Sequence, residues 1–221
     1  MINRVLLYNS GGGIGDAIQM LPLFNTLKNE LKNTKFYYLS AHENHFNSTL
    51  KDFNCEIDTL KLQIKYFGFR WWHGLIINKK IKENSIETFD LILDLQSKIR
   101  NSLILKLLPH KNFISPCLNF KLSKPKLNIK KEKKISSTII KSLNFIYNMD
   151  CKINEFDMNT INKKFFTESE KLLPKNNYVG FSITQGNVYR KKELPLNNIV
   201  SLCSIFKKAN KTPVFFIEKK K

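Results

Sequence analysis

The feature that most constrains the fold is a short strand-like segment near the start of the chain that leads directly into a cluster of glycines. Residues 4–8 are Arg-Val-Leu-Leu-Tyr, and residues 9–16 follow as Asn-Ser-Gly-Gly-Gly-Ile-Gly-Asp. Apolar residues then recur at helical spacing over 17–31, and residues 35–40 indicate a second strand. This order predicts a β-α-β unit with parallel strands and a right-handed crossover.

The next part of the chain continues to alternate between strands and helices. We expect helices over 43–53, 98–108 and 136–149, and strands over 56–60, 89–96 and 112–115. The lysine-rich, proline-containing residues 119–134 are expected to form a solvated loop. The pattern predicts an α/β fold of the doubly wound, Rossmann-like kind.

A domain boundary is indicated by Leu-Pro-Lys-Asn-Asn at 173–177. A second β-α-β start follows, with a strand over 178–183, a polar loop over 184–194, a helix over 195–208 and a strand over 213–217. Two strands and one helix cannot close a doubly wound sheet. We therefore predict one domain over 1–174 and an incomplete, truncated second domain over 175–221.

Residues 65–80 mix aromatic and cationic side chains and contain both tryptophans of the chain. Such a segment can meet a bilayer surface or a glycolipid, because aromatic and long cationic side chains suit the boundary between water and lipid. Aromatic packing beneath a long loop is the alternative. His73 has no neighbouring partner in the sequence, which argues against a role as a ligand.

The charge of the chain bears on its partners. The net charge is +19, and of 37 Lys and Arg residues only four are arginine. Base readout and bidentate phosphate contacts favour arginine, so this balance argues against specific nucleic-acid recognition. A general attraction to anionic surfaces, such as phospholipid or a phosphorylated glycolipid, is still expected.

The sequence shows no apolar run near the roughly 20 residues that a membrane-spanning helix needs. Its first residues pass straight into a strand without the order of a signal peptide. We expect a cytoplasmic protein, with peripheral contact to the inner face of the cytoplasmic membrane as an option. The four cysteines lack paired spacing, so neither a metal site nor a disulfide is expected, and buried free thiols are.

The glycine-rich turn brings backbone close to any ligand, and some of its glycines can adopt positive φ. The candidate binding glycines are Gly12, Gly13 and Gly15. The spacing misses GxGxxG, because the sixth position from Gly11 is Asp16, whose charge would repel a pyrophosphate. An acid at the carboxyl edge of a strand suits a general base, although Asp16 can equally complement the helix dipole.

The polar loop after the later strand contains Thr184, Arg190 and Lys192, with consecutive cations at 190–192. Such cations at a strand-helix junction can stabilise a diphosphate leaving group. A solvated run of charge is the alternative. Pro195 suits the first turn of the following helix.

Two of these motifs resemble those of glycosyltransferase family 9, the ADP-heptose:lipopolysaccharide heptosyltransferases. The first is Gly15-Asp16 followed, after five residues, by Pro22; the second is Lys192-Glu193-Leu194-Pro195, where the family has Lys-x-Trp-Pro and this chain has Leu194 in place of Trp. The resemblance implies a GT-B-like fold with two facing Rossmann-like domains, the first on the acceptor side and the second binding the donor. It implies inverting transfer of a heptose, or a related sugar, from a nucleotide-diphosphate sugar such as ADP-heptose to a glycolipid acceptor of the lipopolysaccharide core.

In the family the matching aspartate is the proposed base, which falls on Asp16, and Lys192 would contact the donor phosphates. Asp94 and Gln96, at the end of a similar strand, would be acceptor contacts. The resemblance demands neither a metal nor another cofactor. Two alternatives remain: a nucleotide-cofactor oxidoreductase or methyltransferase, for which Glu43 is the nearest ribose-binding acid, and a non-catalytic, basic surface-binding protein.

Overall fold

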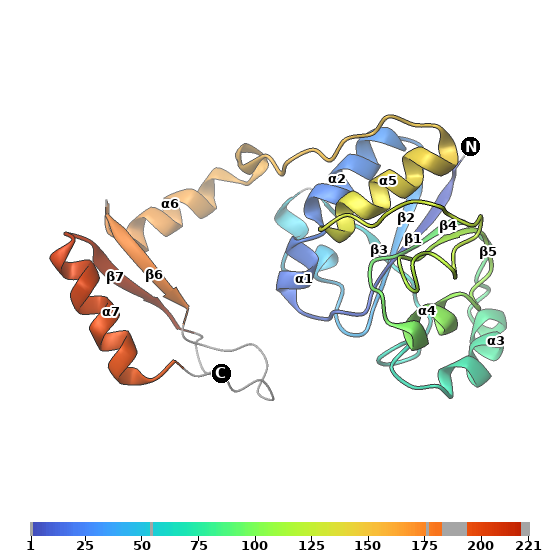
Figure 1. Ribbon diagram of the computed structural model, residues 1–221, viewed down its shortest axis with the longest axis horizontal. Helices are drawn as coiled ribbons and strands as arrows, with labels where there is room; N and C mark the ends of the chain where they lie inside the picture. Colours follow the sequence, from blue (N-terminus) through green and yellow to red (C-terminus); the bar gives the residue numbers. More distant parts are fainter. Residues whose placement is uncertain (1, 54, 176, 183–193, 218–221) are drawn as a thin grey trace. The chain divides into compact units, whose positions relative to one another are not determined.

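The computed structural model describes residues 2–53, 55–175, 177–182 and 194–217 (Figure 1). The chain divides into two compact units, Met1–Thr160 and Ile161–Lys221, each of which is described by itself. The sequence places the domain boundary at 174/175, whereas the division between units falls earlier, so helix α6 groups with the second unit.

The first unit is built on a parallel sheet of five strands in the order β3-β2-β1-β4-β5, which confirms the predicted α/β class. Its strands are β1 (Arg4–Asn9), β2 (Lys35–Ser40), β3 (Asp58–Thr59), β4 (Phe89–Asp94) and β5 (His110–Ile114). Its helices are α1 (Ile14–Ile18), α2 (Leu21–Glu30), α3 (His73–Glu83), α4 (Ile99–Leu105) and α5 (Ile135–Tyr147).

Both faces of this sheet are apolar, and the side chains of β1 alternate between them. Val5 and Leu7 belong to the core under α1, α2 and α5, whereas Leu6 and Tyr8 belong to the core under α3 and α4 (Figure 1). All four are buried. A strand with helices on both sides requires such a continuous apolar run, because neither of its faces meets water. Burying each aliphatic side chain of this kind contributes about 1.5–3 kcal/mol.

Pro22 divides the helix that the sequence predicts over 17–31. The structure has two helices there, α1 and α2, and Pro22 lies in the first turn of α2. At that position the missing N–H of proline has no helical partner to lose. In one continuous helix the ring would clash with the carbonyl group four residues earlier.

The predicted helix over 43–53 is also wrong, because the Asn44 side chain forms hydrogen bonds with backbone N–H and C=O groups in this region. Two short 3-10 turns, His45–Asn47 and Lys51–Phe53, occupy the segment. The Asn44 Oδ1 accepts a hydrogen bond from the Phe46 N–H at 3.1 Å, and the Asn44 Nδ2 donates to the Ile57 carbonyl at 2.9 Å. Such side-chain bonds compete with helix formation.

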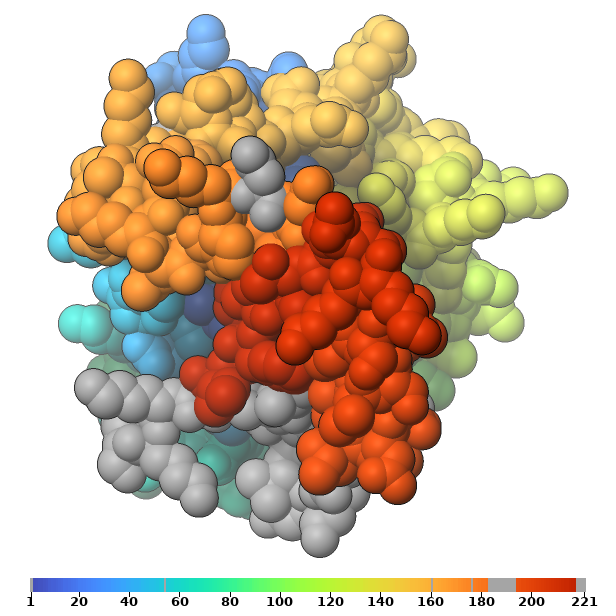
Figure 2. All heavy atoms as spheres, turned by 90° about the vertical axis from the view of Figure 1, so that its left-hand side faces the viewer, coloured from blue at the N-terminus to red at the C-terminus, as the bar shows by residue number. Residues whose placement is uncertain are grey.

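The second unit contains α6 (Lys163–Leu172), β6 (Tyr178–Ser182), α7 (Leu196–Lys208) and β7 (Thr212–Phe216), drawn from orange to red in Figures 1 and 2. Strands β6 and β7 pair in parallel, as the predicted β-α-β start requires. Its apolar side chains are largely exposed, among them Leu196 at 73% and Phe216 at 50%. The described residues therefore leave the apolar faces of this unit uncovered.

Cys55, Cys117 and Cys151 are buried free thiols, as predicted, whereas Cys203 is only half-buried. None of the helices in the described ranges combines the length and the apolar content needed to cross a bilayer.

The loop before α3 is fixed to the sheet through a glycine that no other residue can replace without strain. Gly68 has φ +84°, and a Cβ added there would lie 2.6 Å from the Tyr8 hydroxyl oxygen. That hydroxyl donates to the Phe67 carbonyl at 2.9 Å, and the Gly68 N–H donates to His73 Nδ1 at 3.1 Å. His73 therefore has a structural partner within the first unit.

We expect Gly68→Ala to lower the free energy of unfolding by about 1–3 kcal/mol, because it adds backbone strain and displaces a buried hydroxyl. Gly74→Ala is the matched control: Gly74 is helical, and its added Cβ would meet only the Leu107 Cδ1 at 3.5 Å. Urea unfolding measures both. Equal effects of the two substitutions would contradict the strained role of Gly68.

Candidate functional site

The candidate site lies where the order of the strands reverses direction along the chain. From β1 the chain proceeds to β2 and β3 on one side, and then returns to form β4 on the other side of β1. In parallel sheets, ligands bind beside the carboxyl ends of the strands at such a point. Here β1 ends at Asn9 and β4 at Asp94.

One amide pair joins the two strand ends. The Gln96 Nε2 donates to the Asn9 Oδ1 at 2.8 Å, and the same oxygen accepts the Gly11 N–H at 3.0 Å. Asn9 is buried, and Gln96 is half-buried. The start of the glycine-rich turn is therefore held in place from the neighbouring strand.

The glycines of the turn differ in what they contribute. A Cβ on Gly11 would lie 2.3 Å from the Asp16 Oδ2, and a Cβ on Gly12 would lie 1.8 Å from the His42 Cδ2. Gly13 would make only an ordinary contact, and Gly15 none within 4 Å. No glycine in this turn has positive φ. That part of the expectation was wrong: Gly11 and Gly12 are needed for close packing rather than for backbone freedom.

Asp16 lies in the first turn of α1 and is exposed. Its carboxylate lies against Gly11, because the Oδ2 is the atom that a Cβ there would meet first. A carboxylate in this position is accessible to a substrate hydroxyl, and it also complements the dipole of α1.

A pocket of about 750 Å³ lies at the carboxyl ends of β2 and β3. His42 connects it to the turn, since His42 packs on Gly12 and its ring meets the Tyr66 ring edge-on at 4.9 Å. Lys61 and Lys65 also line the pocket and are exposed. These cations give it the charge to attract an anionic ligand.

Lys65 and Tyr66 fall within the segment 65–80, which the sequence predicts can meet a bilayer surface or a glycolipid. The sequence analysis did not identify His42 or Lys61 as site residues. A signal for them was available: each follows the end of a strand, and the carboxyl ends of parallel strands share one edge.

Asp94, which the resemblance places among the acceptor contacts, is completely buried. Its carboxylate accepts hydrogen bonds from the Ser115 hydroxyl at 2.7 Å, the Ser102 hydroxyl at 2.5 Å and the Gln96 N–H at 3.0 Å. Burial raises the pKa of Asp94 to about 6, and these hydrogen bonds oppose the rise. In this structure the Asp94 carboxylate joins α4 and the end of β5 to β4 through hydrogen bonds, and it is not accessible to a ligand.

The predicted donor contacts Thr184, Arg190 and Lys192 lie outside the described residues. The elements on either side are in place: β6 ends at Ser182, and α7 begins at Leu196, with Pro195 at its N-cap position.

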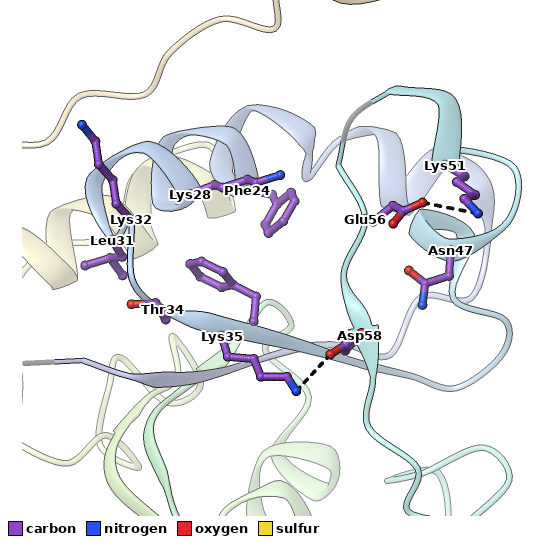
Figure 3. A pocket seen from close by; sticks show the side chains of 11 residues that line it. Phe24, Lys28, Leu31, Lys32, Thr34, Lys35, Asn47, Lys51, Glu56 and Asp58 are labelled. Carbon is purple, nitrogen blue, oxygen red and sulfur yellow. Dashed lines mark ion pairs between the residues drawn. The ribbon is translucent and has the colours of Figure 1, made fainter.

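A different cavity, of about 550 Å³, lies at the opposite edge of the sheet (Figure 3). Lys35 at this cavity is in register with Arg4, the first residue of β1. Of its four lysines, Lys35 pairs with Asp58 at 3.4 Å, and Lys51 pairs with Glu56 at 3.5 Å. Its charge is therefore partly neutralised, and it lies at the edge away from Asp16.

Among the residues that the structure describes, no group of three or more His, Cys, Asp or Glu side chains is placed to hold a metal ion.

Comparison with known proteins gives matches to solved structures only. No protein-family model matches the chain, and neither does any curated protein. A glycosyl transferase family 9 protein from Veillonella parvula DSM 2008 is 16% identical with a TM-score of 0.57, over 97% of this chain and 62% of that one. The E. coli heptosyltransferase WaaC with ADP-2-deoxy-2-fluoro heptose is 14% identical with a TM-score of 0.61, over 98% of this chain and 69% of that one. WaaC with ADP is 13% identical with a TM-score of 0.59, over 98% and 68%.

At these identities the likeness shows the fold, which is α/β of the GT-B type. The chain spans 62–69% of the length of these structures.

The raised pKa of Asp94 predicts how stability depends on pH. Between its ordinary pKa of 3.8 and about 6, the folded protein holds a proton that the unfolded chain has released. The free energy of unfolding should therefore fall as the pH rises through this window, by at most about 1.4 kcal/mol per pH unit. Asp94→Asn should remove this dependence, as measured by urea unfolding at a series of pH values.

Asp90, on the same strand as Asp94, is expected to affect the free energy of unfolding in the opposite direction as the pH changes. Its pKa is lowered by Lys111 and by the N–H groups of Asn3 and Arg4. Asp90 therefore stabilises the fold above its ordinary pKa, and this contribution is lost as the pH falls below that value. An Asp94→Asn protein with the pH dependence unchanged between 4 and 6 would contradict the assignment to Asp94.

Proposed function

We propose that this protein is a glycosyltransferase that moves a sugar from a nucleotide-diphosphate donor to the hydroxyl group of an anionic glycolipid acceptor. The observation that carries the proposal is the exposed Asp16 carboxylate on the glycine-rich turn, at the point where the strand order reverses. The GT-B type of fold supports it, since the similar structures are a family 9 glycosyl transferase and a heptosyltransferase.

Asp16 acts as the general base in this proposal. Its carboxylate takes the proton from the acceptor hydroxyl while that oxygen attacks the anomeric carbon of the donor sugar. The bond from this carbon to the diphosphate breaks, and the nucleoside diphosphate leaves with the electron pair. A single displacement of this kind inverts the anomeric configuration. Accessibility of the carboxylate is essential, because a base must come within hydrogen-bonding distance of the proton.

The acceptor is proposed to occupy the pocket beside the turn. Lys61 and Lys65 would pair with its negative groups, and the rings of His42 and Tyr66 offer flat surfaces against which a sugar can pack. Gln96 lies beside the turn at the end of β4 and is the remaining candidate for an acceptor contact. A lipopolysaccharide core acceptor, with its phosphate and carboxylate groups, has the matching charge.

The donor is proposed to be ADP-heptose or another nucleotide sugar, since the similar WaaC structures contain ADP or ADP-2-deoxy-2-fluoro heptose. Lys192, with Arg190 and Thr184, would offset the charge that develops on the departing diphosphate. This role requires no metal ion, because side chains and backbone N–H groups supply the positive charge.

Replacing the base tests the proposal. Asp16→Asn should lower the turnover of sugar transfer by about 10²-fold or more, since general-base catalysis contributes on that order. Transfer is measured with ADP-heptose and a lipopolysaccharide core acceptor, with a thermal melt to confirm folding.

Glu43→Gln is the matched control, because Glu43 is another exposed acid beside the end of β2. It should leave transfer unchanged. Undiminished turnover of the Asp16→Asn protein would refute the base assignment. Loss of a bound nucleotide cofactor in the Glu43→Gln protein would favour a dinucleotide enzyme instead.

A further inference from the structure

The first unit exposes a stripe of large apolar side chains on one side of α4. Ile99 and Leu103, four residues apart on α4, are 47% and 39% exposed and share one side, and Leu107, two residues beyond the end of the helix, is 49% exposed. Large apolar residues that gather on a surface, rather than lie scattered, mark a site of contact with a partner or a membrane.

The start of α3 and the loop before it add to this stripe. Trp71, Trp72 and Leu75 are 63%, 53% and 85% exposed. The two elements are neighbours, because a Cβ on Gly74 would lie 3.5 Å from the Leu107 Cδ1. Both helices cover the same face of the sheet, opposite α2 and α5 (Figure 1). We call these six apolar residues the α3–α4 patch.

Side-chain contacts join the loop before α3 to α4. The Arg100 Nε donates to the Gly68 carbonyl at 3.0 Å, and its guanidinium lies 5.9 Å from the centre of the Phe69 ring. The Asn101 Nδ2 donates to the Tyr8 hydroxyl at 3.2 Å, and that hydroxyl in turn holds the loop at Phe67.

The charge around the patch is predominantly positive. Residues 59–82 and 95–131, which include the whole patch, contain no aspartate or glutamate at all. Exposed cations are interspersed among the apolar residues, namely Lys65, Arg70 and Lys98; Lys79 is also exposed but pairs with Glu83 on α3 at 3.7 Å. A second copy of the chain would bring identical positive charges together across a two-fold contact, which disfavours self-association. An anionic surface has the complementary charge.

We propose that the α3–α4 patch docks the protein on an anionic phospholipid membrane. Tryptophan rings sit at the level of the lipid headgroups, leucine side chains reach the acyl boundary, and lysine and arginine extend to the phosphates. The loop that carries the tryptophans also supplies Lys61, Lys65 and Tyr66 to the pocket that His42 connects to the glycine-rich turn. A docked membrane would present the glycolipid acceptor to this pocket, and this part of the inference rests on the proposed function. Membrane binding itself is independent of the proposed function.

The two tryptophans are the only ones in the chain, so their fluorescence reports on the patch alone. The full chain is titrated with phosphatidylcholine vesicles and with vesicles that also contain phosphatidylglycerol. We expect binding to the anionic vesicles, a blue shift of the emission, quenching by brominated acyl chains, and affinity that falls with added salt.

Leu75→Ser should weaken vesicle binding about tenfold, because a leucine that enters the lipid boundary loses its transfer free energy. Leu172→Ser is the matched control: Leu172 lies on α6 and is 83% exposed, against 85% for Leu75. It should leave the affinity unchanged. Both side chains are so exposed that neither change should unfold the protein, which a thermal melt verifies.

Several outcomes would overturn the proposal. These are an absence of binding to anionic vesicles, binding without a tryptophan shift, and equal losses in the two leucine variants. Concentration-dependent dimerisation that Leu75→Ser abolishes would assign the patch to a second copy, and a tryptophan shift caused by an oligonucleotide but not by vesicles would assign it to nucleic acid. None of these measurements uses sugar transfer, so failure of the proposed function would leave them unaffected.

Discussion

The hydrogen bond between the Gln96 and Asn9 side chains joins the ends of β4 and β1, and the candidate site depends on it. The Asn9 Oδ1 accepts hydrogen bonds from both the Gln96 Nε2 and the Gly11 N–H, so the first glycine of the turn is connected to both strands. The position of the Asp16 carboxylate follows, because that carboxylate lies against Gly11. Gly12 then allows His42, which lines the pocket at the ends of β2 and β3, to pack on the turn.

Two aspartates in this region show how the surroundings set the chemistry of a side chain. Asp94 ends a fully buried strand, and two serine hydroxyls and an N–H surround its carboxylate, so it serves the fold. Asp16 follows a turn that consists mainly of glycine, and its side chain is exposed to solvent. Both follow apolar strand residues in the sequence. The serines that distinguish them come from α4 and from the end of β5, which local sequence cannot reveal.

The sequence predicted those elements of the fold that are determined by neighbouring residues along the chain. The run at 4–8 and the glycines after it predicted the central strand and its turn, and the β-α-β starts in both units were predicted as well. The helix over 17–31 was wrong in one respect, since the pattern of apolar residues continues through Pro22 although the backbone cannot. Helix α3 was not predicted, because Gly74 lies in its first turn and no side chain caps its start. Helix α6 was missed although Asn162 caps it, because its sequence is mostly polar, with Phe165, Phe166 and Leu172 as its only large apolar residues.

The central claim is that ligands bind at the sheet edge formed by the ends of β1, β2 and β4. Hydrogen exchange, followed by mass spectrometry with and without a lipid-free lipopolysaccharide core oligosaccharide, tests it most directly. We predict slower exchange in peptides covering 9–16, 40–46 and 60–66, and no change in those covering 28–36 and 47–53 at the cavity of Figure 3. Protection confined to the latter peptides would contradict the account.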